Sequence, residues 1–383
     1  MTAMIKAQLE HLTSQSSQAD STPSRTHAGS PYMQYAKLHS EAKYNLAASG
    51  VTSYPLAELP IKIEDLEING PTLYGYQPLL ERLAKLNGVT PDCVVTAQGT
   101  SLANHLAIAA TLEPGEEALV EWPTYELLTT TLQYLGVRVR FFDRGVEHDF
   151  RVDPEEVERK VTPETRLIVL TNLHNPSGAL IDDATLRAVG DIARKNNARV
   201  LVDEVYLESM FAQRPCPAIH LGDHFVVTSS LTKAFGLSGV RCGWVLANPE
   251  LAQRMQYIHD LYGVNAAFPA DLISVVALDH LDRVAARAKK LLDSNRPVLD
   301  AFLRSRDDIA CVRPEFGTVA FPRLLHGTVD QLDRLLREKY ETGVVPGKYF
   351  GEKQHFRVGI GGDPEMTRIG FERLGAALDE MRK

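Results

Sequence analysis

A regular alternation of short apolar runs with amphipathic helical stretches, between residues 90 and 262, restricts the fold of this chain more than any other feature. Strands separated by helices of this length need crossover connections, which are right-handed in nearly all proteins and build a mainly parallel sheet with helices on both faces. The predicted strands are residues 94–97, 118–121, 137–142, 166–171, 199–202, 225–229 and 243–247. The predicted helices include residues 103–112, 126–135, 184–196 and 250–261. In such sheets, ligands bind outside the carboxyl ends of the strands.

The pattern changes after about residue 285, where helical stretches at 283–304, 329–340 and from Pro364 onward surround short apolar runs at 309–312, 318–321 and 356–360. We therefore predict an α/β fold with two domains. A three-layer α/β/α large domain at residues 51–285 contains a seven-stranded, mostly parallel sheet, and a smaller α+β domain occupies residues 286–383. Residues 31–50 are predicted to pack on the small domain, and the polar residues 1–30 to be a disordered tail.

Composition excludes several classes of function. The net charge of −8 on 383 residues argues against non-specific nucleic-acid binding, which needs a basic surface. No apolar run is long enough to span a membrane, and the N-terminus lacks the pattern of a secretory signal. The cysteines Cys93, Cys216, Cys242 and Cys311 are scattered without CxxC spacing, which fits a reduced cytoplasm and gives no support to a metal site. We therefore predict a cytoplasmic protein with no metal, no membrane partner and no nucleic-acid partner.

The segment from Ser230 to Gly243 carries the strongest chemical signal. It places Lys233 eight residues before Arg241, with the hydroxyl of Ser230 three residues before the lysine. Ser230 and Arg241 can hold an anion, and Lys233 is left free to attack a carbonyl as an amine nucleophile. A phosphate-bearing aldehyde would use all of these groups, and pyridoxal 5′-phosphate (PLP) is the obvious candidate. Taken alone, the segment also fits a solvated lysine in a glycine-rich turn.

Two further segments place suitable groups at predicted strand ends. Gly99, Thr100 and Ser101 follow a strand and begin a helix, whose N-terminal backbone N–H groups bind phosphate well. The alternative for this loop is an ordinary strand-to-helix turn with a hydroxyl cap. Tyr125 follows the next strand and can stack on an aromatic cofactor, or it can simply pack under the following helix.

The next two strand ends supply an amide, a carboxylate and a phenol. The proline after Asn175 keeps that residue out of helical backbone angles, so its amide can face the crevice, although Asn–Pro also occurs in ordinary turns. Asp203 ends a wholly apolar strand, where a carboxylate is costly unless it is paired. A protonated pyridine nitrogen is a fitting partner. Tyr206 can reach the phenolic oxygen of such a cofactor or be a half-buried rim tyrosine. Glu204 and His174 are interpreted as structural.

In this order, the elements resemble the fold-type I PLP-dependent aminotransferases, specifically the class I/II family. The resemblance runs from about Tyr44 to the C-terminus. Asn175, Asp203, Lys233 and Arg241 are separated by 28, 30 and 8 residues, and all three intervals resemble the family pattern. Agreement of four residue types at these separations makes coincidence improbable.

The family resemblance implies a role for each position. Lys233 forms the internal Schiff base, and Asp203 pairs with the pyridine nitrogen. Asn175 and Tyr206 bond the phenolic oxygen, and Tyr125 stacks on the ring. The phosphate is held by backbone and side-chain groups from three segments: Gly99, Thr100, Ser101, Ser230 and Arg241. Of all these residues, Lys233, Asp203 and Tyr206 are predicted to be catalytic.

Further positions concern the substrate and a neighbouring subunit. Arg357 lies in a late strand that resembles the family's carboxylate-binding strand, and a planar guanidinium suits bidentate contact with an α-carboxylate. Gly50 resembles the N-terminal glycine that lines the same pocket, and Asn175 is also predicted to contact the substrate. Tyr74 resembles the tyrosine that reaches a neighbouring subunit's phosphate. It lies unusually close to the following glycine, and Tyr76 is an alternative.

The resemblance implies a PLP-dependent aminotransferase that moves the amino group of an α-amino acid to a 2-oxo acid by a ping-pong mechanism, in a homodimer. Residues 261–268 contain no basic residue where aspartate-specific members carry a second arginine, so a dicarboxylate preference by that route is not expected. The alternatives keep the cofactor and change the reaction, to β-elimination as in carbon–sulfur lyases or to specialised biosynthesis such as cyclising an arginine derivative. A transcription regulator with an aminotransferase-like sensor would need a DNA-binding domain ahead of the fold, for which the polar N-terminus is too short.

Overall fold

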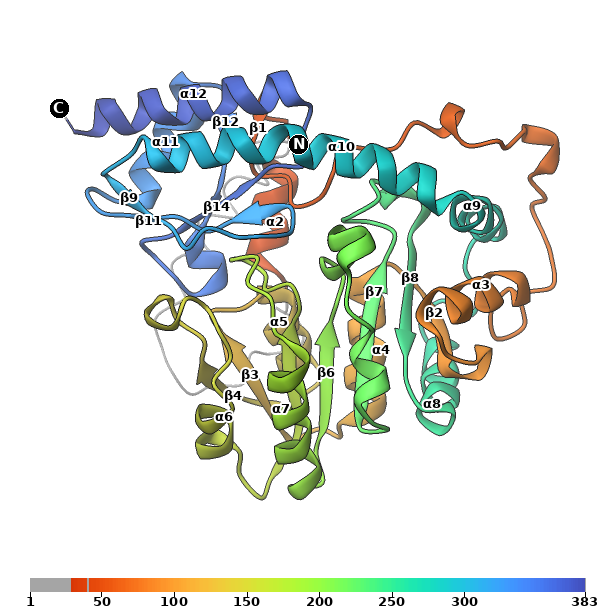
Figure 1. Cartoon of the computed structure of the whole chain (residues 1–383). Coiled ribbons are helices and arrows are strands. Elements are labelled where there is room, and N and C mark those ends of the chain that lie inside the picture. The colour runs from red at the N-terminus through yellow and green to blue at the C-terminus, as the bar shows by residue number, and fades with distance from the viewer. Residues whose placement is uncertain (1–28, 40, 383) are drawn as a thin grey trace, which may run out of the picture.

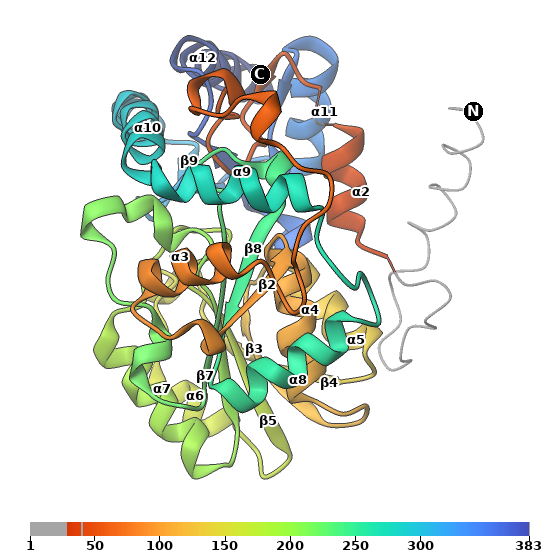
Figure 2. The same ribbon diagram turned by 90° about the vertical axis from the view of Figure 1, so that its right-hand side faces the viewer.

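The computed structural model describes residues 29–39 and 41–382. In Figures 1 and 2 a large sheet with helices on both faces forms one part of the molecule, and a smaller group of helices and short strands lies against one end of that sheet. The disordered tail predicted at residues 1–30 falls outside the described residues, except for Gly29 and Ser30.

The main sheet has seven strands, in the order β2-β8-β7-β6-β5-β3-β4. Strand β8 is antiparallel to both of its neighbours, and the other pairings are parallel, so the prediction of a mostly parallel seven-stranded sheet is confirmed. In chain order the strands are β2 (Val94–Gln98), β3 (Glu117–Trp122), β4 (Arg138–Asp143), β5 (Thr165–Thr171), β6 (Arg199–Asp203), β7 (Phe225–Ser230) and β8 (Cys242–Leu246). Each lies within two residues of its predicted bounds.

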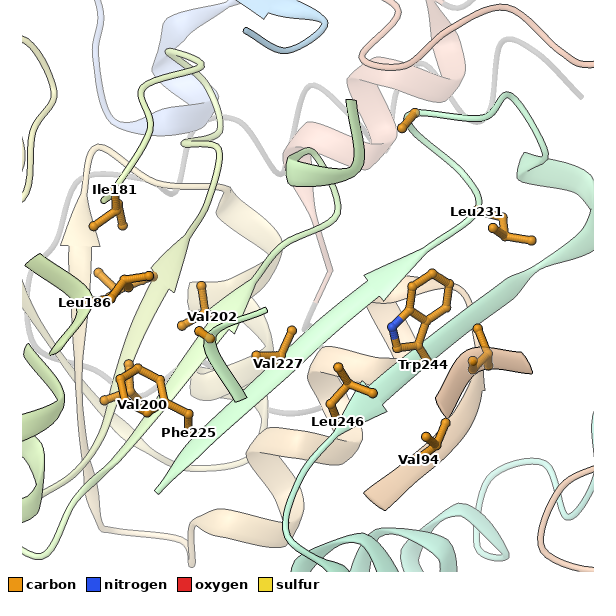
Figure 3. Packing of buried hydrophobic residues seen from close by; sticks show 14 of the residues in the cluster. Val94, Ile181, Leu186, Val200, Val202, Phe225, Val227, Leu231, Trp244 and Leu246 are labelled. Atoms are coloured by element: carbon orange, nitrogen blue, oxygen red, sulfur yellow. The ribbon is translucent and has the colours of Figure 1, made fainter. Parts of the chain in front are cut away.

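The central strands are apolar at successive positions because both faces of the sheet are covered. Along β6, Val200 and Val202 point into one hydrophobic cluster, while Leu201 points into the other. Figure 3 shows the first cluster, in which Trp244 packs near Val227. Side chains are contributed to this cluster by α3 (Gln77–Asn87), α6 (Pro154–Lys160), α7 (Asp183–Lys195) and α9 (Phe268–Asp279). The opposite face is covered by α4 (Thr100–Thr111), α5 (Glu126–Tyr134) and α8 (Pro249–His259).

Four of the observed helices, α2 (Pro31–Leu38), α3, α6 and α9, were not among those predicted from the sequence pattern. Helix α9 is apolar over most of its first ten residues, so it lacks the polar face that makes a helix recognisable. Helices α2 and α6 have only eight and seven residues, which is too short for a clear period. Each begins with a proline after a side-chain cap, Ser30 for α2 and Asp153 for α6.

The smaller part of the molecule contains α10 (Leu281–Arg304), α11 (Val329–Lys339) and α12 (Pro364–Met381), which lie together at the top of Figure 1. They enclose a separate hydrophobic cluster with the short strands β10 (Val319–Ala320) and β14 (Phe356–Gly359), and β13 (Val345–Pro346) pairs with the other edge of β14. Helix α10 serves both parts, because Val284 packs in the large core and Ala288 in the smaller one. A domain boundary near residue 285 therefore remains our proposal.

The N-terminal segment is pressed directly against β14. Strand β1 (Tyr44–Asn45) pairs with β12 (Thr342–Gly343), and Leu46 packs in the core of the smaller part. The Gly359 N–H donates to the Leu46 carbonyl at 2.7 Å. A Cβ at Gly359 would lie 1.8 Å from the Ala48 carbonyl oxygen, so the two backbones approach as closely as only glycine permits. This contact brings residues 46–51 to the end of the large sheet.

Candidate active site

A cavity of about 400 Å³ lies at the carboxyl ends of the strands, between the large sheet, the N-terminal segment and β13. Eight of the predicted site residues line it: Thr100, Ser101, Tyr125, Asn175, Asp203, Tyr206, Lys233 and Arg241. They end or follow five strands, β2, β3, β5, β6 and β7, except for Arg241, which directly precedes β8. Ser230, Gly99, Gly50 and Arg357 lie directly behind this lining, as described below, whereas Tyr74 lies elsewhere.

One end of the cavity is built to hold an anion. The Thr100 hydroxyl donates to the Ser230 hydroxyl at 2.8 Å, at the N-terminus of α4. Gly99 has a φ of 80°, and a Cβ there would lie 2.3 Å from Nη2 of Arg241, so only glycine leaves room for the guanidinium. Arg241 is held in place by donating to the carbonyl of Gln98 at 2.9 Å. Two hydroxyls, a guanidinium and a helix N-terminus together suit a phosphate.

Asp203 lies buried at the end of β6 and is aimed into the same cavity. Its carboxylate accepts hydrogen bonds from Nδ2 of Asn104 at 2.8 Å and from the Val205 N–H at 3.1 Å. Burial raises the pKa of Asp203 to about 6, against the opposing effects of these two donors and of the Lys233 charge. A cationic ring nitrogen would supply the charge partner that this carboxylate lacks among the described residues.

Asn104 is a site residue that sequence reasoning missed. Besides donating to Asp203, its amide oxygen accepts from the Thr228 hydroxyl at 2.5 Å, so both ends of the amide are committed. The available signal was its position one helical turn after Thr100, on the same face of a helix that begins at the site. A buried asparagine at such a position needs a hydrogen-bond partner, and the nearest candidate is the carboxylate of Asp203 at the end of β6.

Lys233 reaches the middle of the cavity, half-buried, where its Nζ donates to the Ser49 hydroxyl at 2.8 Å. The N-terminal segment also holds the lysine backbone, because the Val51 N–H donates to the Lys233 carbonyl at 2.9 Å. Gly50 lies between these two contacts, and a Cβ there would be 2.8 Å from the same carbonyl oxygen. The structure thus places Gly50 behind Lys233, and Ala47, Ala48 and Ser49 form the surface of the cavity.

Three predicted residues surround the space between Asp203 and Lys233. The Tyr206 hydroxyl is buried and has no hydrogen-bond partner among the described residues. The Asn175 side-chain oxygen accepts from Nη1 of Arg357 at 3.0 Å, which leaves its NH₂ group available. Tyr125 borders the cavity, and its buried phenol has a pKa well above the ordinary value because of desolvation. A phenolate oxygen of a bound ring would satisfy the orphaned Tyr206 hydroxyl.

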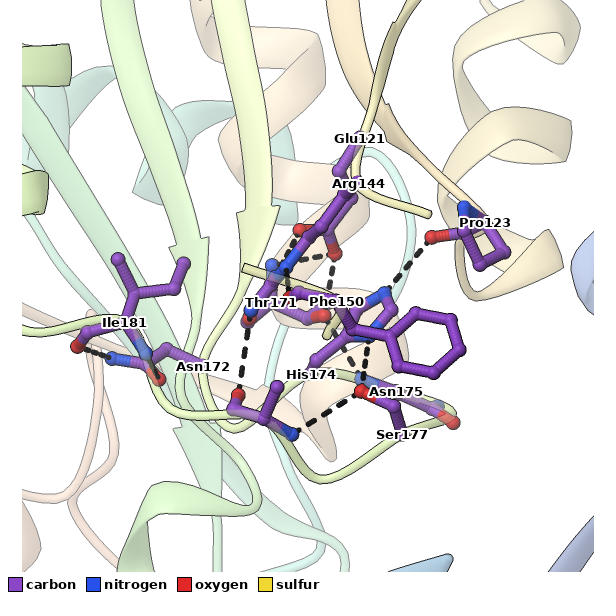
Figure 4. Close-up of polar contacts among 11 residues, drawn as sticks. Glu121, Pro123, Arg144, Phe150, Thr171, Asn172, His174, Asn175, Ser177 and Ile181 are labelled. Atoms are coloured by element: carbon purple, nitrogen blue, oxygen red, sulfur yellow. Dashed lines mark hydrogen bonds and ion pairs between the residues drawn. The ribbon is translucent and has the colours of Figure 1, made fainter. Parts of the chain in front are cut away.

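A buried ion pair supports the Asn175 loop from behind (Figure 4). Arg144 and Glu121, both fully buried, are joined at 2.5 Å, and Arg144 also donates to the carbonyls of Phe150 and Thr171. The second oxygen of Glu121 accepts from the N–H and the hydroxyl of Thr171, whose hydroxyl in turn accepts the Asn175 N–H at 3.0 Å. The orientation of Asn175 is therefore fixed by a fully satisfied polar network.

His174 and Glu204, interpreted from the sequence as structural, have structural partners. The His174 ring bonds the Ser177 hydroxyl at 2.7 Å and the Pro123 carbonyl at 2.9 Å (Figure 4). Glu204 accepts the Ala218 N–H at 2.8 Å, and burial raises its pKa to about 8. Neither residue lines the cavity.

Arg357 is buried in β14, behind Tyr32 and Asn175, which line the cavity. Its Nη2 donates to the Tyr32 hydroxyl at 2.9 Å, while Nε is buried without a hydrogen-bond partner among the described residues. The guanidinium thus keeps an unused donor beside Nη2, which is the arrangement that a bidentate carboxylate requires. Its ring neighbours, Tyr32 and Phe350, lie 5.5 and 5.0 Å from the guanidinium carbon.

Tyr32 on α2 is the second residue that sequence reasoning missed. Burial raises the pKa of its phenol, but the charges of Arg357 and Lys233, with hydrogen bonds from Arg357 and Ser49, outweigh burial, so the net pKa lies below its ordinary value. The helix is anchored by the Tyr35 hydroxyl, which donates to Asp333 and to the Val344 carbonyl. The signal available was Ser30-Pro31, a capped helix start next to two tyrosines.

Tyr74 does not line this cavity. Its ring is half exposed and packs edge-on against Tyr257 at 5.8 Å, on the loop before α3. Tyr76, the alternative, packs against Phe268 of its own chain at 5.0 Å. Of the two tyrosines, Tyr74 is the one available to a neighbouring molecule, and its predicted contact there stays a prediction.

Within residues 29–39 and 41–382, no group of three His, Cys, Asp or Glu side chains is placed to hold a metal ion. In the same part of the chain, no helix has the length and apolar character to cross a membrane. The donor set of the cavity instead matches an organic group with a phosphate, a protonated ring nitrogen, a phenolic oxygen and a carbon that reacts with an amine. Pyridoxal 5′-phosphate has all four.

Comparison with known proteins agrees with this reading. The profile of the family "Aminotransferase class I and II" matches residues 65–374. Capreomycidine synthase of Streptomyces vinaceus is 29% identical over 354 residues, which cover 89% of this chain and 90% of that protein. Histidinol-phosphate aminotransferase of Pectobacterium carotovorum is 28% identical over 294 residues, covering 75% and 77%. A PLP-dependent aminotransferase from Streptococcus suis superposes with a TM-score of 0.87 at 25% identity, over 92% of this chain and 98% of that one.

Proposed function

Because this chain belongs to the family of class I and II aminotransferases, whose cofactor is pyridoxal 5′-phosphate, we propose that it moves the amino group of an α-amino acid to a 2-oxo acid, with Lys233 as the reactive amine. The observation that carries the proposal is that Lys233 and Asp203, from different strand ends, line one buried cavity together with an anion-binding end. No rearrangement is needed to bring these groups to one ligand.

The cofactor would be held by residues at three points. Thr100, Ser230 and Arg241 would bind its phosphate, Asp203 its ring nitrogen, and Tyr206 its phenolic oxygen, next to Asn175. When bound, the cofactor supplies a carbon that accepts the substrate's amino group and a ring that withdraws electrons from the substrate's Cα. Asp203 keeps the ring nitrogen protonated, and Asn104 keeps Asp203 ionised and correctly oriented.

Lys233 has two tasks in this proposal. Its amine would attack the cofactor's aldehyde carbon, whose oxygen would leave as water. With a substrate bound, the free Lys233 amine would move a proton at the substrate's Cα as general acid and base. The Ser49 hydroxyl, 2.8 Å from Nζ, limits the positions that the amine can occupy.

Arg357 would bind the α-carboxylate of the substrate through its unused Nε and through Nη2, which would give up its long contact of 3.4 Å with the Ala47 carbonyl. The Tyr32 hydroxyl, which lines the cavity and accepts from Nη2 at 2.9 Å, would orient the guanidinium. With the carboxylate anchored there and the amine directed at the cofactor, the Cα–H bond faces Lys233, so orientation contributes to the rate.

The half-reaction tests the proposal. Adding an α-amino acid to the PLP-loaded protein without an acceptor should convert one equivalent of bound cofactor per chain, seen as a change in its absorbance. A 2-oxo acid should reverse the change. Lys233→Ala should lose at least about 10⁴-fold in rate, since it removes both nucleophile and proton carrier. Lys289→Ala, on the exposed face of α10, is the matched control. Turnover of Lys233→Ala at the wild-type rate, or failure of the wild-type protein to bind PLP, would refute the proposal.

A second candidate function is elimination or cyclisation at the substrate's side chain with the same cofactor. Two observations favour it: the similarity to capreomycidine synthase, and the Tyr32 phenol, a second acid–base group held between Arg357 and Lys233. Release of pyruvate and ammonia from β-chloroalanine, with no 2-oxo acid present, would identify the elimination. Retention of the amino group on the cofactor would identify transamination.

We also propose a cytoplasmic homodimer in which Tyr74 reaches the phosphate site of the neighbouring subunit. The support is the exposure of Tyr74, which lines a hollow with Leu73 and Val264, next to a second hollow lined by Arg241. Light scattering should give twice the chain mass of 42.4 kDa. A monomer that retains full activity would refute this arrangement.

A further inference from the structure

The cavity has a second end, away from the groups proposed to hold the cofactor. It is lined by four residues of α2 (Tyr32, Met33, Tyr35 and Ala36), by His39 at the end of that helix, and by Asn45, Ala47 and Val345. Helix α2 is fixed there at both sides, since Tyr35 donates to Asp333 of α11 and Ser30 donates to Glu126 of α5 (Figure 1 shows α2 in red). A substrate whose α-carboxylate is bound by Arg357 has this end left for its side chain.

None of the described residues at this second end carries a carboxylate or an aliphatic amine. Burial, followed by the charge of Arg337, lowers the pKa of His39 below its ordinary value, so its ring is neutral near pH 7. The cations that line the cavity or lie directly behind it, Lys233, Arg241 and Arg357, have the roles already proposed, and Arg337 is paired with Asp333 at 3.1 Å. A charged substrate side chain would therefore leave water without gaining a partner of opposite charge, which is strongly unfavourable.

The same surface offers good contacts to an uncharged ring. The rings of Tyr32 and Tyr125 meet edge-on at 5.6 Å, and Tyr32 also packs against Phe350 at 5.7 Å. Aromatic edges, the Met33 thioether and the small side chains Ala36 and Ala47 favour a flat apolar group. The Tyr35 hydroxyl is already committed to Asp333 and the Val344 carbonyl, so it makes no demand on the substrate.

We propose that this end of the cavity selects α-amino acids with an uncharged aromatic or large apolar side chain over those with an acidic or a cationic one. The inference rests on the proposed function, because it assumes that Arg357 anchors the substrate's carboxylate. It names the substrate class of that site.

Carboxylic acids without an amino group test the selection without any reaction. We would measure binding of 3-phenylpropionate, glutarate and 5-guanidinopentanoate to the PLP-loaded protein by isothermal titration calorimetry. The phenyl compound should bind at least about 30-fold more tightly than either charged one, which corresponds to the loss of about 2 kcal/mol when a charge is buried unpaired. Equal or tighter binding of glutarate or of 5-guanidinopentanoate would overturn the proposal.

A substitution on α2 tests the location. Ala36→Asp places a carboxylate at this end, and it should reverse the preference toward 5-guanidinopentanoate by at least about 10-fold. Gln34→Asp adds the same charge on the exposed face of α2 and should leave the order of affinities unchanged. If the order of affinities is unchanged in Ala36→Asp while PLP is still bound, the substrate's side chain does not lie beside α2.

The two proposals fail in different ways. If no amino acid changes the cofactor's absorbance but 3-phenylpropionate binds selectively, the selection stands and the transamination is wrong. If amino acids react but charged and aromatic ones do so with the same kcat/KM, the transamination stands and the selection is wrong.

Discussion

Replacing Asn104 by Ala should make the stability of the cofactor-free protein depend on pH in a new range. In the folded protein, burial raises the pKa of Asp203 to about 6, from an ordinary value of 3.8, although Asn104 opposes the shift. A hydrogen bond to a charged group contributes about 1.5–3 kcal/mol, which is about 1–2 pKa units. Removing the Asn104 amide should therefore raise the pKa of Asp203 to roughly 7–8.

The direction of this pH dependence follows from whether the folded or the unfolded protein binds the Asp203 proton more tightly. Because the folded-state pKa of Asp203 is above the unfolded one, its contribution to stability is complete below about pH 4 and is lost as pH rises through about 6. In Asn104→Ala the loss continues to roughly pH 8. The stability difference between variant and wild type should thus grow by about 1.5–3 kcal/mol between pH 5 and pH 8.5.

Denaturant titrations of the cofactor-free protein at these two pH values measure that growth. Asn295→Ala is the matched control, because Asn295 is equally buried but donates to the Ile360 and Gly362 carbonyls, far from Asp203. It should lose stability by the same amount at both pH values. If Asn104→Ala also shows a difference that does not change with pH, Asn104 does not control the charge of Asp203, and our account of the ring-nitrogen partner is wrong.

Three further predictions concern other parts of the site. Arg144→Leu leaves the carboxylate of Glu121 buried and unpaired, so the free energy of unfolding should fall by about 3–5 kcal/mol in a denaturant titration; an unchanged midpoint would disprove this. Gly99→Ala would put a Cβ 2.3 Å from the Arg241 guanidinium, so affinity for PLP should fall at least about 10-fold in absorbance titrations. Affinity for unphosphorylated pyridoxal should stay constant, and equal losses for both compounds would count against a phosphate site. Tyr32→Phe removes the hydroxyl that holds the Arg357 guanidinium, which is proposed to bind the substrate's carboxylate, so KM for the amino donor should rise about 10-fold with kcat changed less than about 3-fold. A loss confined to kcat would contradict a positioning role for Tyr32.

The features that the sequence predicted are those that depend on local pattern. The central strands were recognisable because buried strands covered on both faces are continuous apolar runs, and Asp203 stood out because a carboxylate ends one of them. The spacing of Asn175, Asp203, Lys233 and Arg241 then indicated one site. All four residues line or border the cavity.

The features that the sequence did not predict depend on contacts between distant segments. The position of Asn104 one helical turn after Thr100 places it near the site, but its contact with Asp203, 99 residues away, depends on how α4 packs on the sheet. Tyr32 lies at a helix start of only eight residues, and its partner Arg357 is 325 residues further on. Arg144 resembles a surface arginine until the fold encloses it with Glu121.

The packing of residues 46–51 against β14 also affects the order in which the enzyme matures during translation. Every residue proposed to hold the cofactor lies before residue 242, whereas Arg357 and the strand that carries it are synthesised near the end. Since domains fold in order as they leave the ribosome, the nascent chain would complete the half proposed to bind the cofactor while it still lacks the arginine proposed to bind a substrate's carboxylate. The emerging polypeptide would then acquire its coenzyme well before it could consume a metabolite.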